Sequence, residues 1–269
     1  MSSFFTNKVV VITGGTDGIG KALVDAMIQA GAKVATCSRH YDKLYSLQME
    51  YTNVLLHTTV CDVSKEQDCR RFISSTIETF GGIDILINNA GVSMRALVSD
   101  TDVDVIRRVM DVNFFGAVYC TKFALPSITQ RKGTIVGVSS IAGYRGLPGR
   151  SGYSASKFAL QGWLESLRTE LLEKDVNVMW VCPGFTTSNI RNASLTKDGS
   201  PQGNSTMDEG KMMSAAECAH YILIAIEKKK RTIVLTFTGK RTVFMNKFFP
   251  ALADKLTHNF FFKDGKLVK

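Results

Sequence analysis

The sequence predicts an α/β protein built on one doubly wound sheet of about seven parallel strands, with helices on both faces. Short runs rich in Val and Ile alternate with helical stretches along the chain. The runs lack polar–apolar alternation, which is typical of strands buried on both faces. Strict alternation of strand and helix requires right-handed crossovers and therefore a parallel sheet. A (β/α)8 barrel is the rival fold, but the chain offers no eighth strand–helix unit.

Each element is predicted from its own pattern. Strands are expected at residues 8–12, 33–37, 53–60, 83–87, 134–138, 176–181 and 232–236, where β-branched residues cluster. Helical periodicity predicts helices at residues 18–30, 42–50, 65–80, 103–110, 112–129, 154–172 and 214–227. Gly81 and Gly82 mark the end of the third helix. Residues 1–239 therefore form one domain, with a polar lid at about 186–213, and residues 240–269 form a basic, aromatic helical tail.

Composition and charge exclude several classes of protein. Of the 269 residues, 45% are apolar and 21% are charged, which is ordinary for a globular protein. No apolar run approaches the roughly 18–20 residues that cross a bilayer, and no secretory leader is recognisable, so we expect a cytoplasmic protein. Residues 1–227 carry 22 basic and 22 acidic side chains, whereas residues 228–269 carry 11 and 2. Because a nucleic-acid-binding domain spreads its basic residues over the fold, we expect no nucleic-acid partner.

Cysteine and histidine spacing gives no sign of a metal site or a hydrolase. The six cysteines form no C-x-x-C pair and no zinc-ligand spacing with His, so no metal is predicted. We expect them to be small buried residues in a reducing compartment. The chain also lacks G-x-S-x-G, and its four histidines lie away from the serine motifs, which excludes a serine hydrolase.

A glycine-rich turn follows the first predicted strand. Residues 13–20 read TGGTDGIG and open a predicted helix. Glycines let the backbone turn tightly and approach a pyrophosphate, and the free N–H groups at the helix start favour that anion. A strand before the turn and a helix after it are what a dinucleotide site requires.

The order of motifs resembles the short-chain dehydrogenase/reductase family over about residues 8–235. The motifs are TGxxxGxG at the first strand, NNAG at 88–91, Asn113, Ser139–Ser140, YxxxK at 153–157 and Pro183–Gly184. The resemblance implies a single-domain Rossmann-type fold and an oxidoreductase that transfers a hydride between a nicotinamide cofactor and a carbonyl or secondary alcohol. One alternative is a catalytically inactive NADP-binding regulatory or sensor protein, which the intact motif set disfavours. An epimerase or dehydratase is disfavoured by NNAG and the glycine spacing.

The resemblance assigns four catalytic residues. Tyr153 is the proton donor and acceptor, and Lys157 holds the nicotinamide ribose. These two residues lie four apart, on one face of a helix, so we expect the ammonium to lower the pKa of the phenol. Ser140, thirteen residues before the tyrosine, is preferred to Ser139 as the hydroxyl that polarises the carbonyl. Asn113 matches the asparagine that holds a water on the proton relay.

Cofactor choice depends on the end of the second strand. Ser38 stands where an NAD site carries an acidic residue, and the Arg39 guanidinium suits a 2′-phosphate. NADP is therefore preferred to NAD. The alternative that Arg39 is simply a solvated surface charge stays open, and Asp17 stands where some NADP-binding members carry a basic residue. The resemblance assigns cofactor binding to Gly14, Thr16, Asp17, Gly18, Ile19, Gly20, Ser38, Arg39, Asp62, Val63, Asn89, Ala90, Gly91, Tyr153, Lys157, Pro183, Gly184, Thr186 and Ser188.

The substrate side is expected between the lid and residues 92–96 and 141–150. Met94, Tyr144 and Leu147 suggest a partly apolar pocket, which fits a hydrophobic ketone such as a steroid-, retinoid- or lipid-like molecule. Arg145 and Arg150 complicate this interpretation, because either can bind a carboxylate or lie on the surface.

The lid and tail resemble the branch of the family with dehydrogenase/reductase member 7-like proteins and 11β-hydroxysteroid dehydrogenases. The likeness lies in residues 187–199 and 228–256. In the tail, aromatic and leucine side chains recur at helical spacing among lysines, which is typical of an amphipathic helix on an anionic membrane. We favour the alternative, in which the aromatics pack on the lid or a neighbouring subunit. Because the family pairs its long helices across two-fold axes, a homodimer or homotetramer is expected.

Overall fold

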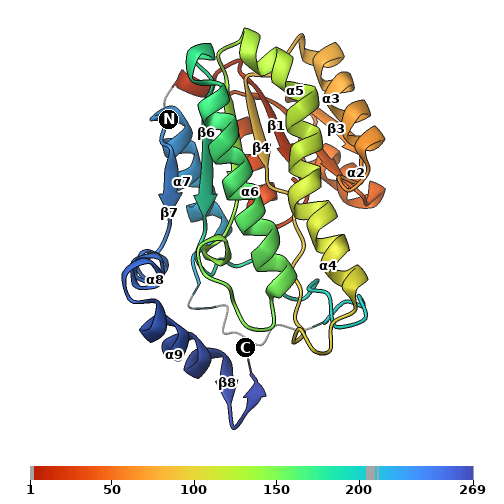
Figure 1. Ribbon diagram of the computed structural model, residues 1–269. Coiled ribbons are helices and arrows are strands. Elements are labelled where there is room, and N and C mark those ends of the chain that lie inside the picture. Colours follow the sequence, from red (N-terminus) through yellow and green to blue (C-terminus); the bar gives the residue numbers. More distant parts are fainter. Residues whose placement is uncertain (1–2, 204–209, 211, 269) are drawn as a thin grey trace.

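The computed structural model describes residues 3–203, 210 and 212–268, and a seven-stranded parallel sheet forms its centre (Figure 1). The strand order is β3-β2-β1-β4-β5-β6-β7. The strands are β1 Val9–Thr13, β2 Lys33–Ser38, β3 Leu56–Val60, β4 Ile85–Asn88, β5 Thr134–Val138, β6 Asn177–Cys182 and β7 Thr232–Val234. Every predicted strand is confirmed, although β3 begins three residues later than predicted because Thr52 and Asn53 form a turn.

Helices cover both faces of the sheet (Figure 1). One layer holds α3 (Glu66–Phe80), α5 (Gly116–Gln130) and α6 (Ser151–Glu170), and the other holds α1 (Gly18–Gln29), α2 (Tyr41–Glu50) and α7 (Ala215–Glu227). Side chains of β1 alternate between the two cores: Val11 packs with the first layer, and Val10 and Ile12 with the second. Both cores are therefore apolar, which explains the unbroken apolar strands.

The strand order reverses direction between β1 and β4. The chain proceeds outward from β1 to β2 and β3, then returns to the other side of β1 at β4. The loops that follow β1 and β4 therefore diverge and leave a crevice at the carboxyl ends of the strands, which is where open α/β sheets bind ligands. The strands run with their carboxyl ends toward the lower end of the molecule in Figure 1.

The helical segment after β4 differs from the prediction of two separate helices. Helix α4 (Val103–Met110) passes into a π turn, Asp111–Phe115, and then into α5 without leaving helical backbone geometry. A π turn closes i→i+5 hydrogen bonds and is common at functional sites. The sequence pattern at 111 was interpreted as a break because the extra residue shifts the apolar spacing.

The tail is two helices and a hairpin rather than one helix. Helix α8 spans Phe237–Phe248, and α9 spans Pro250–Phe261, with the proline in the first turn where its missing N–H costs nothing. Strands β8 (Phe262–Lys263) and β9 (Lys266–Leu267) pair antiparallel and end the described chain. The tail lies below the carboxyl ends of the strands (Figure 1). Within the described residues, no helix combines the length and apolarity that crossing a bilayer demands.

All six cysteines are free and buried, as the sequence predicts.

Candidate active site

The glycine loop closely approaches its neighbours on both sides. It joins β1 to α1, and the Gly15 N–H donates to Thr36 Oγ1 at 3.0 Å. A Cβ on Gly15 would lie 2.1 Å from that same oxygen, and one on Gly20 would lie 2.1 Å from the Gly14 carbonyl oxygen. Side chains at these two positions would collide with the protein around the loop, so glycine is what allows this tight turn at the start of α1, where a pyrophosphate can bind.

The NNAG segment after β4 is tied to the glycine loop. The backbone N–H groups of Asn89 and Ala90 both donate to Thr13 Oγ1, each at 3.0 Å. The Asn89 side chain donates to the carbonyl oxygens of Thr13, at 2.9 Å, and Gly14, at 3.3 Å. These bonds fix the two loops at the crevice that the strand order opens.

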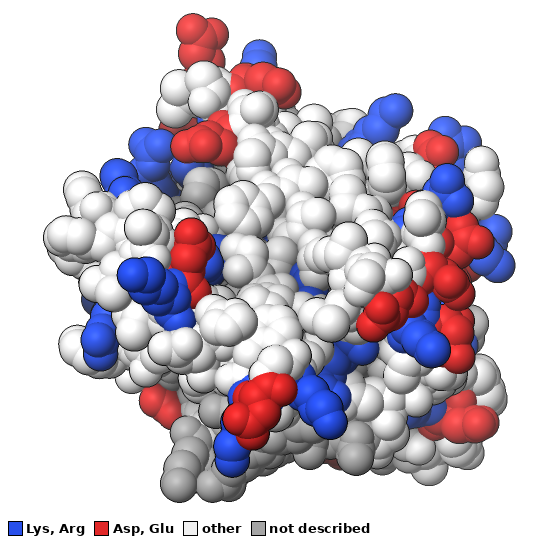
Figure 2. All heavy atoms as spheres, turned by 60° about the horizontal axis from the view of Figure 1, so that its bottom comes forward, with Lys and Arg blue, Asp and Glu red and all other residues white. Residues whose placement is uncertain are grey.

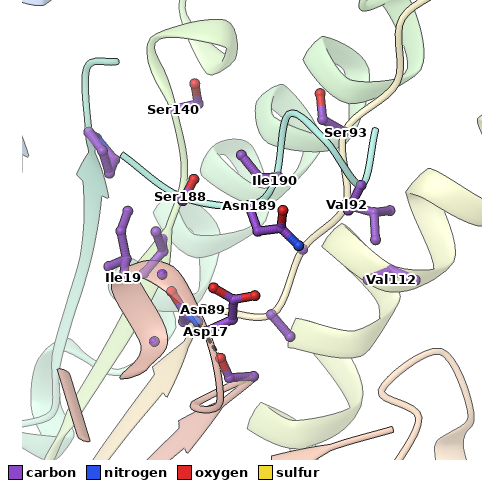
Figure 3. A pocket seen from close by; sticks show the side chains of 18 of the residues that line it. Asp17, Ile19, Asn89, Val92, Ser93, Val112, Ser140, Ser188, Asn189 and Ile190 are labelled. Atoms are coloured by element: carbon purple, nitrogen blue, oxygen red, sulfur yellow. Dashed lines mark hydrogen bonds between the residues drawn. The ribbon is translucent and has the colours of Figure 1, made fainter. Parts of the chain in front are cut away.

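One cleft of about 410 Å³ collects the predicted site residues (Figure 3). Asp17 and Ile19 enter it from the glycine loop, Ser140 from the end of β5, and Ser188 from the segment after β6. All nineteen residues assigned to cofactor binding line this cleft, and so does Ser140. Of the predicted catalytic and cofactor-binding residues, Asn113 alone does not line it and lies behind the wall, 2% exposed.

The adenine end of the cleft carries a cation that the sequence reasoning missed. Lys43, on α2, lines the cleft beside Arg39 and Ser38, and its Nζ lies 3.4 Å from the Asp17 carboxylate. Arg39 is exposed and makes no ion pair within the part of the chain that the structure describes. Lys43 therefore offsets the Asp17 charge that departs from the family pattern. Its spacing from Asp17 along the chain gave no local signal.

The two candidate serines have different partners. Ser139 is buried, and its Oγ accepts a hydrogen bond from Gln161 Nε2 at 2.8 Å. Ser140 Oγ accepts from the Ala142 N–H at 3.1 Å and caps the short 3-10 turn Ile141–Gly143. The Ser140 hydroxyl lies within hydrogen-bond reach of the Tyr153 phenol, whereas Ser139 is held by α6 behind it. This geometry favours Ser140.

The expected effect of Lys157 on the Tyr153 pKa is wrong in this structure. Burial raises the pKa of the Tyr153 phenol, and the Ser140 hydroxyl and Arg150 guanidinium only partly oppose the rise. Lys157 Nζ donates to the Val138 carbonyl at 2.9 Å and lies 5.6 Å from the Tyr153 ring centroid. Burial also lowers the Lys157 pKa to about 8. Removal from water is the largest cause of both pKa shifts, because both groups are enclosed.

Asn113 links the π turn to the active-site wall. Its Oδ1 accepts from the Val92 N–H at 2.8 Å, and its Nδ2 donates to the Val92 carbonyl at 2.9 Å and to Ser156 Oγ at 2.9 Å. A Cβ on Gly91 would lie 3.2 Å from Asn113 Oδ1 and 3.6 Å from Lys157 Nζ. The side chain therefore fixes the segment after β4 against α6, close to the lysine.

The alkaline limb of kcat/KM for carbonyl reduction should belong to Lys157. Its ammonium is lost as the pH rises through about 8, whereas Tyr153, whose pKa is raised, still holds its proton there. Activity is therefore expected to fall above pH 8. A guanidinium stays charged, so Lys157→Arg should move that limb upward, even if its rate is lower. An identical limb in both proteins, measured as full pH profiles, would assign it to another group.

The substrate side differs in part from the expected apolar wall. Leu147 lines the cleft, but Met94 is fully buried in a separate core. Tyr144 does not line the cleft, and its hydroxyl accepts a hydrogen bond from Trp180 Nε1 at 3.0 Å. The predicted wall contributes Val92 and Ser93, and the predicted lid contributes Asn189, Ile190, Arg191 and Ala193. The sequence reasoning missed other lining residues, namely Cys37, His40, Cys61, Val112, Val138 and Phe185. Of the predicted lid 186–213, residues 204–209 and 211 lie outside the described residues.

The lid is joined to the strand ends by backbone bonds. The Leu195 N–H donates to the Ser93 carbonyl at 2.9 Å, and the Arg95 N–H donates to the Leu195 carbonyl at 2.8 Å. Thr186 bridges to Met213 at the other end of the segment. The lid thus lies along the segment after β4 and closes one side of the cleft.

Comparison with known proteins agrees with the motifs. A family model described as short chain dehydrogenase matches residues 8–199. Dehydrogenase/reductase SDR family member 7B of Mus musculus is 37% identical over 258 residues, which cover 93% of this chain and 80% of that protein. Dehydrogenase/reductase SDR family protein 7-like of Drosophila melanogaster is 36% identical over 236 residues, covering 85% and 72%.

Solved structures share the fold at lower identity. A short chain dehydrogenase/reductase from Burkholderia phymatum, in complex with NAD, superposes with a TM-score of 0.81 at 22% identity, covering 94% of this chain and 96% of that one. An alcohol dehydrogenase from Thermococcus sibiricus, complexed with 5-hydroxy-NADP, gives 0.75 at 24%, covering 85% and 95%. Motif order, sheet topology and relatives agree that the chain belongs to the short-chain dehydrogenase/reductase family, whose members are oxidoreductases acting on CH–OH groups.

Proposed function

We propose that the protein is an NADP-dependent oxidoreductase that interconverts a hydrophobic ketone and its secondary alcohol. The observation that carries this proposal is one cleft with a glycine cradle and Arg39 at one end and Ser140, Tyr153 and Lys157 at the other. The cradle fits a dinucleotide because Gly14, Gly18 and Gly20 line the cleft where α1 begins. Such a cofactor, when bound, supplies or accepts the hydride.

Preference for NADP rests on the charges at the adenine end. Arg39 and Lys43 line that end. Ser38 is neutral, and the described lining residues include no glutamate that would repel a 2′-phosphate. Asp17 is the one nearby carboxylate of the loop, and Lys43 pairs with it. Asp62, the other described carboxylate of the cleft, accepts from Ser64 Oγ, and Arg39 pairs with neither acid, so its guanidinium is available to the phosphorylated cofactor.

The chain's own groups supply the proton chemistry. In the reductive direction, the Tyr153 phenol donates its proton to the carbonyl oxygen, and the Ser140 hydroxyl donates a hydrogen bond to the same oxygen. The raised pKa keeps the phenol protonated near neutrality. Lys157, held by the Val138 carbonyl beneath the cleft, stabilises the phenolate that remains.

The substrate end favours an apolar molecule. Val92, Leu147, Phe185 and Ile190 line it, which suits a steroid-, retinoid- or lipid-like ketone. The test is NADPH consumption with ketosteroids, aromatic ketones and 3-oxoacyl thioesters. Turnover with one class supports the proposal. Tight NADPH binding without turnover of any of them would favour a nucleotide sensor instead.

The tail has a packed face and an exposed face. Phe261 is buried beneath the Arg150 guanidinium, 5.5 Å from the ring centroid, and Phe260 stacks on Phe185 at 6.4 Å. These contacts support the expected packing on the fold. The opposite face leaves Phe248 57% and Phe249 51% exposed, among the lysines of the tail. We propose that this face contacts anionic membrane from the cytoplasm.

Phe248→Ser together with Phe249→Ser is expected to abolish co-sedimentation with vesicles that contain phosphatidylserine. Both rings are exposed, so their loss should leave the fold and the cleft intact. Leu172→Ser, at a leucine 67% exposed on the body of the protein, is the matched control and should bind as the parent does. Equal sedimentation of all three proteins, or none with the parent at low salt, would contradict membrane contact.

We also propose a homodimer or homotetramer formed through α5 and α6. Phe115, just before α5, and Phe158, on α6, are exposed at 39% and 46%. Light scattering after size-exclusion chromatography measures the mass directly, and a mass of 29.6 kDa would contradict the proposal.

A further inference from the structure

Two arginines that the sequence leaves equivalent have different surroundings. Arg145 donates to Asn246 Oδ1 at 2.9 Å and pairs with the Asp254 carboxylate, so it anchors the tail. Arg150 lines the cleft, and its side chain makes no hydrogen bond or ion pair within the described ranges of the chain. Its guanidinium lies over the Phe261 ring, 5.5 Å from the centroid. A largely enclosed guanidinium without an anionic partner is costly unless a ligand supplies one.

The acids of the cleft lie at the far end from Arg150. Among its described lining residues, the only carboxylates are Asp17 and Asp62. Asp17 pairs with Lys43, and Asp62 accepts from Ser64 Oγ at 2.8 Å, beyond the edge strand β3. Arg150 instead precedes α6, three residues before Tyr153 and therefore one helical turn from the reacting phenol. Among the residues that the structure describes, no carboxylate is placed to neutralise it.

Other cations strengthen the positive field at this point. Arg95 and Arg191 lie close enough to Arg150 to lower its pKa, after the larger effect of burial. Arg191 lines the cleft and donates to the Thr186 carbonyl at 3.1 Å, which holds the lid turn together. Arg95 Nε is buried without a partner in the described structure. Figure 2 shows a hollow on this end, rimmed mainly by uncharged atoms, with basic atoms visible inside it.

We infer that Arg150 binds an anionic group of the substrate, so that the preferred substrate is an amphiphilic ketone with a carboxylate or phosphate close to the carbonyl and an apolar chain. The guanidinium would form a forked pair with either oxyanion. The chain would lie along Phe185, which lines the cleft and stacks on Phe260 of the tail. This inference rests on the oxidoreductase function proposed above and specifies its substrate class.

The test compares pairs of ketones that differ only in charge. One pair is 4-oxononanoate and its methyl ester, and another is a phosphorylated α-hydroxyketone and its unphosphorylated form. The parent should favour the anion in kcat/KM by about 10- to 150-fold, and Arg150→Met should remove that preference. Arg150→Lys should retain part of it, because an ammonium keeps the charge without the fork. The pair with the larger preference distinguishes carboxylate from phosphate.

Arg107→Met is the matched control, since Arg107 is an exposed arginine on α4 that lies outside the cleft. It should keep the parent's preference. Equal kcat/KM for both members of each pair in the parent, or an equal loss of both in Arg150→Met, would overturn the inference and leave the oxidoreductase proposal standing.

A binding measurement separates this inference from catalysis. With NADPH present, decanoate should raise the Tm of the parent more than decanol does, and Arg150→Met should abolish the difference. Stabilisation by decanoate without turnover of any ketone would contradict the proposed function but not the anion site. Equal effects of decanoate and decanol on the parent would contradict the anion site.

Discussion

Tyr153→Phe is expected to lower kcat for ketone reduction by about 10²- to 10⁴-fold, the range for loss of a positioned proton donor. The ring is enclosed, and phenylalanine preserves its packing, but the proton that the carbonyl oxygen must receive is gone. NADPH affinity should stay unchanged, because the cradle, Arg39 and Lys157 remain in place. Single-turnover kinetics and fluorescence titration with NADPH measure the two quantities separately.

Tyr221→Phe is the matched control for this substitution. Tyr221 lies on α7 and is 42% exposed, away from the cleft, so the variant should retain the parent's rate. If Tyr153→Phe kept a near-parent kcat, the phenol would not be the proton donor.

Arg39→Ala should weaken the affinity for NADPH about 10-fold and change the affinity for NADH little. A charge-assisted hydrogen bond to phosphate is lost, and the lower end of its range applies because Arg39 is exposed and screened by water. Lys43 remains and should preserve part of the discrimination. Dissociation constants for both cofactors, measured by fluorescence titration at one ionic strength, give the ratio.

Arg71→Ala provides the control for lost charge, since Arg71 is an exposed arginine on α3 that pairs with Asp68 outside the cleft. It should change neither constant. Ser38→Asp should shift preference further toward NADH, because a carboxylate there repels a 2′-phosphate and binds a ribose diol. If Arg39→Ala lost affinity for NADPH and for NADH equally, Arg39 would not recognise the phosphate.

Local patterns in the sequence were sufficient to predict the sheet and one wall of the cleft. The β-branched runs locate every strand. Thr13 ends β1, Asn89 follows β4 and Ser140 lies two residues beyond β5, so parallel topology alone brings them to one edge. Helical spacing likewise places Tyr153 and Lys157 together on α6. These inferences succeed because the residue and its signal lie in the same stretch of chain.

Properties that depend on the folded environment were beyond that reasoning. The rise in the Tyr153 pKa comes from burial, which spacing does not reveal. Lys43 reaches Asp17 only because α2 packs beside the glycine loop, and Arg145 differs from Arg150 only because Asp254 returns from the tail. The start of α9 does have a local signal, because Pro250 stands within an apolar repeat and a proline there indicates the first turn of a new helix.

The π turn makes this part of the chain sensitive to changes in length rather than in composition. It holds one residue more than an α turn, so deletion of one residue would let the helix close regularly and rotate α4 against α5 by about 100°. Helix α5 buries Cys120, Ala124 and Ile128, and α4 buries Val105 and Val109, so both buried faces cannot survive that rotation. A one-residue insertion or deletion here is therefore far more severe than any exchange at exposed Asp111.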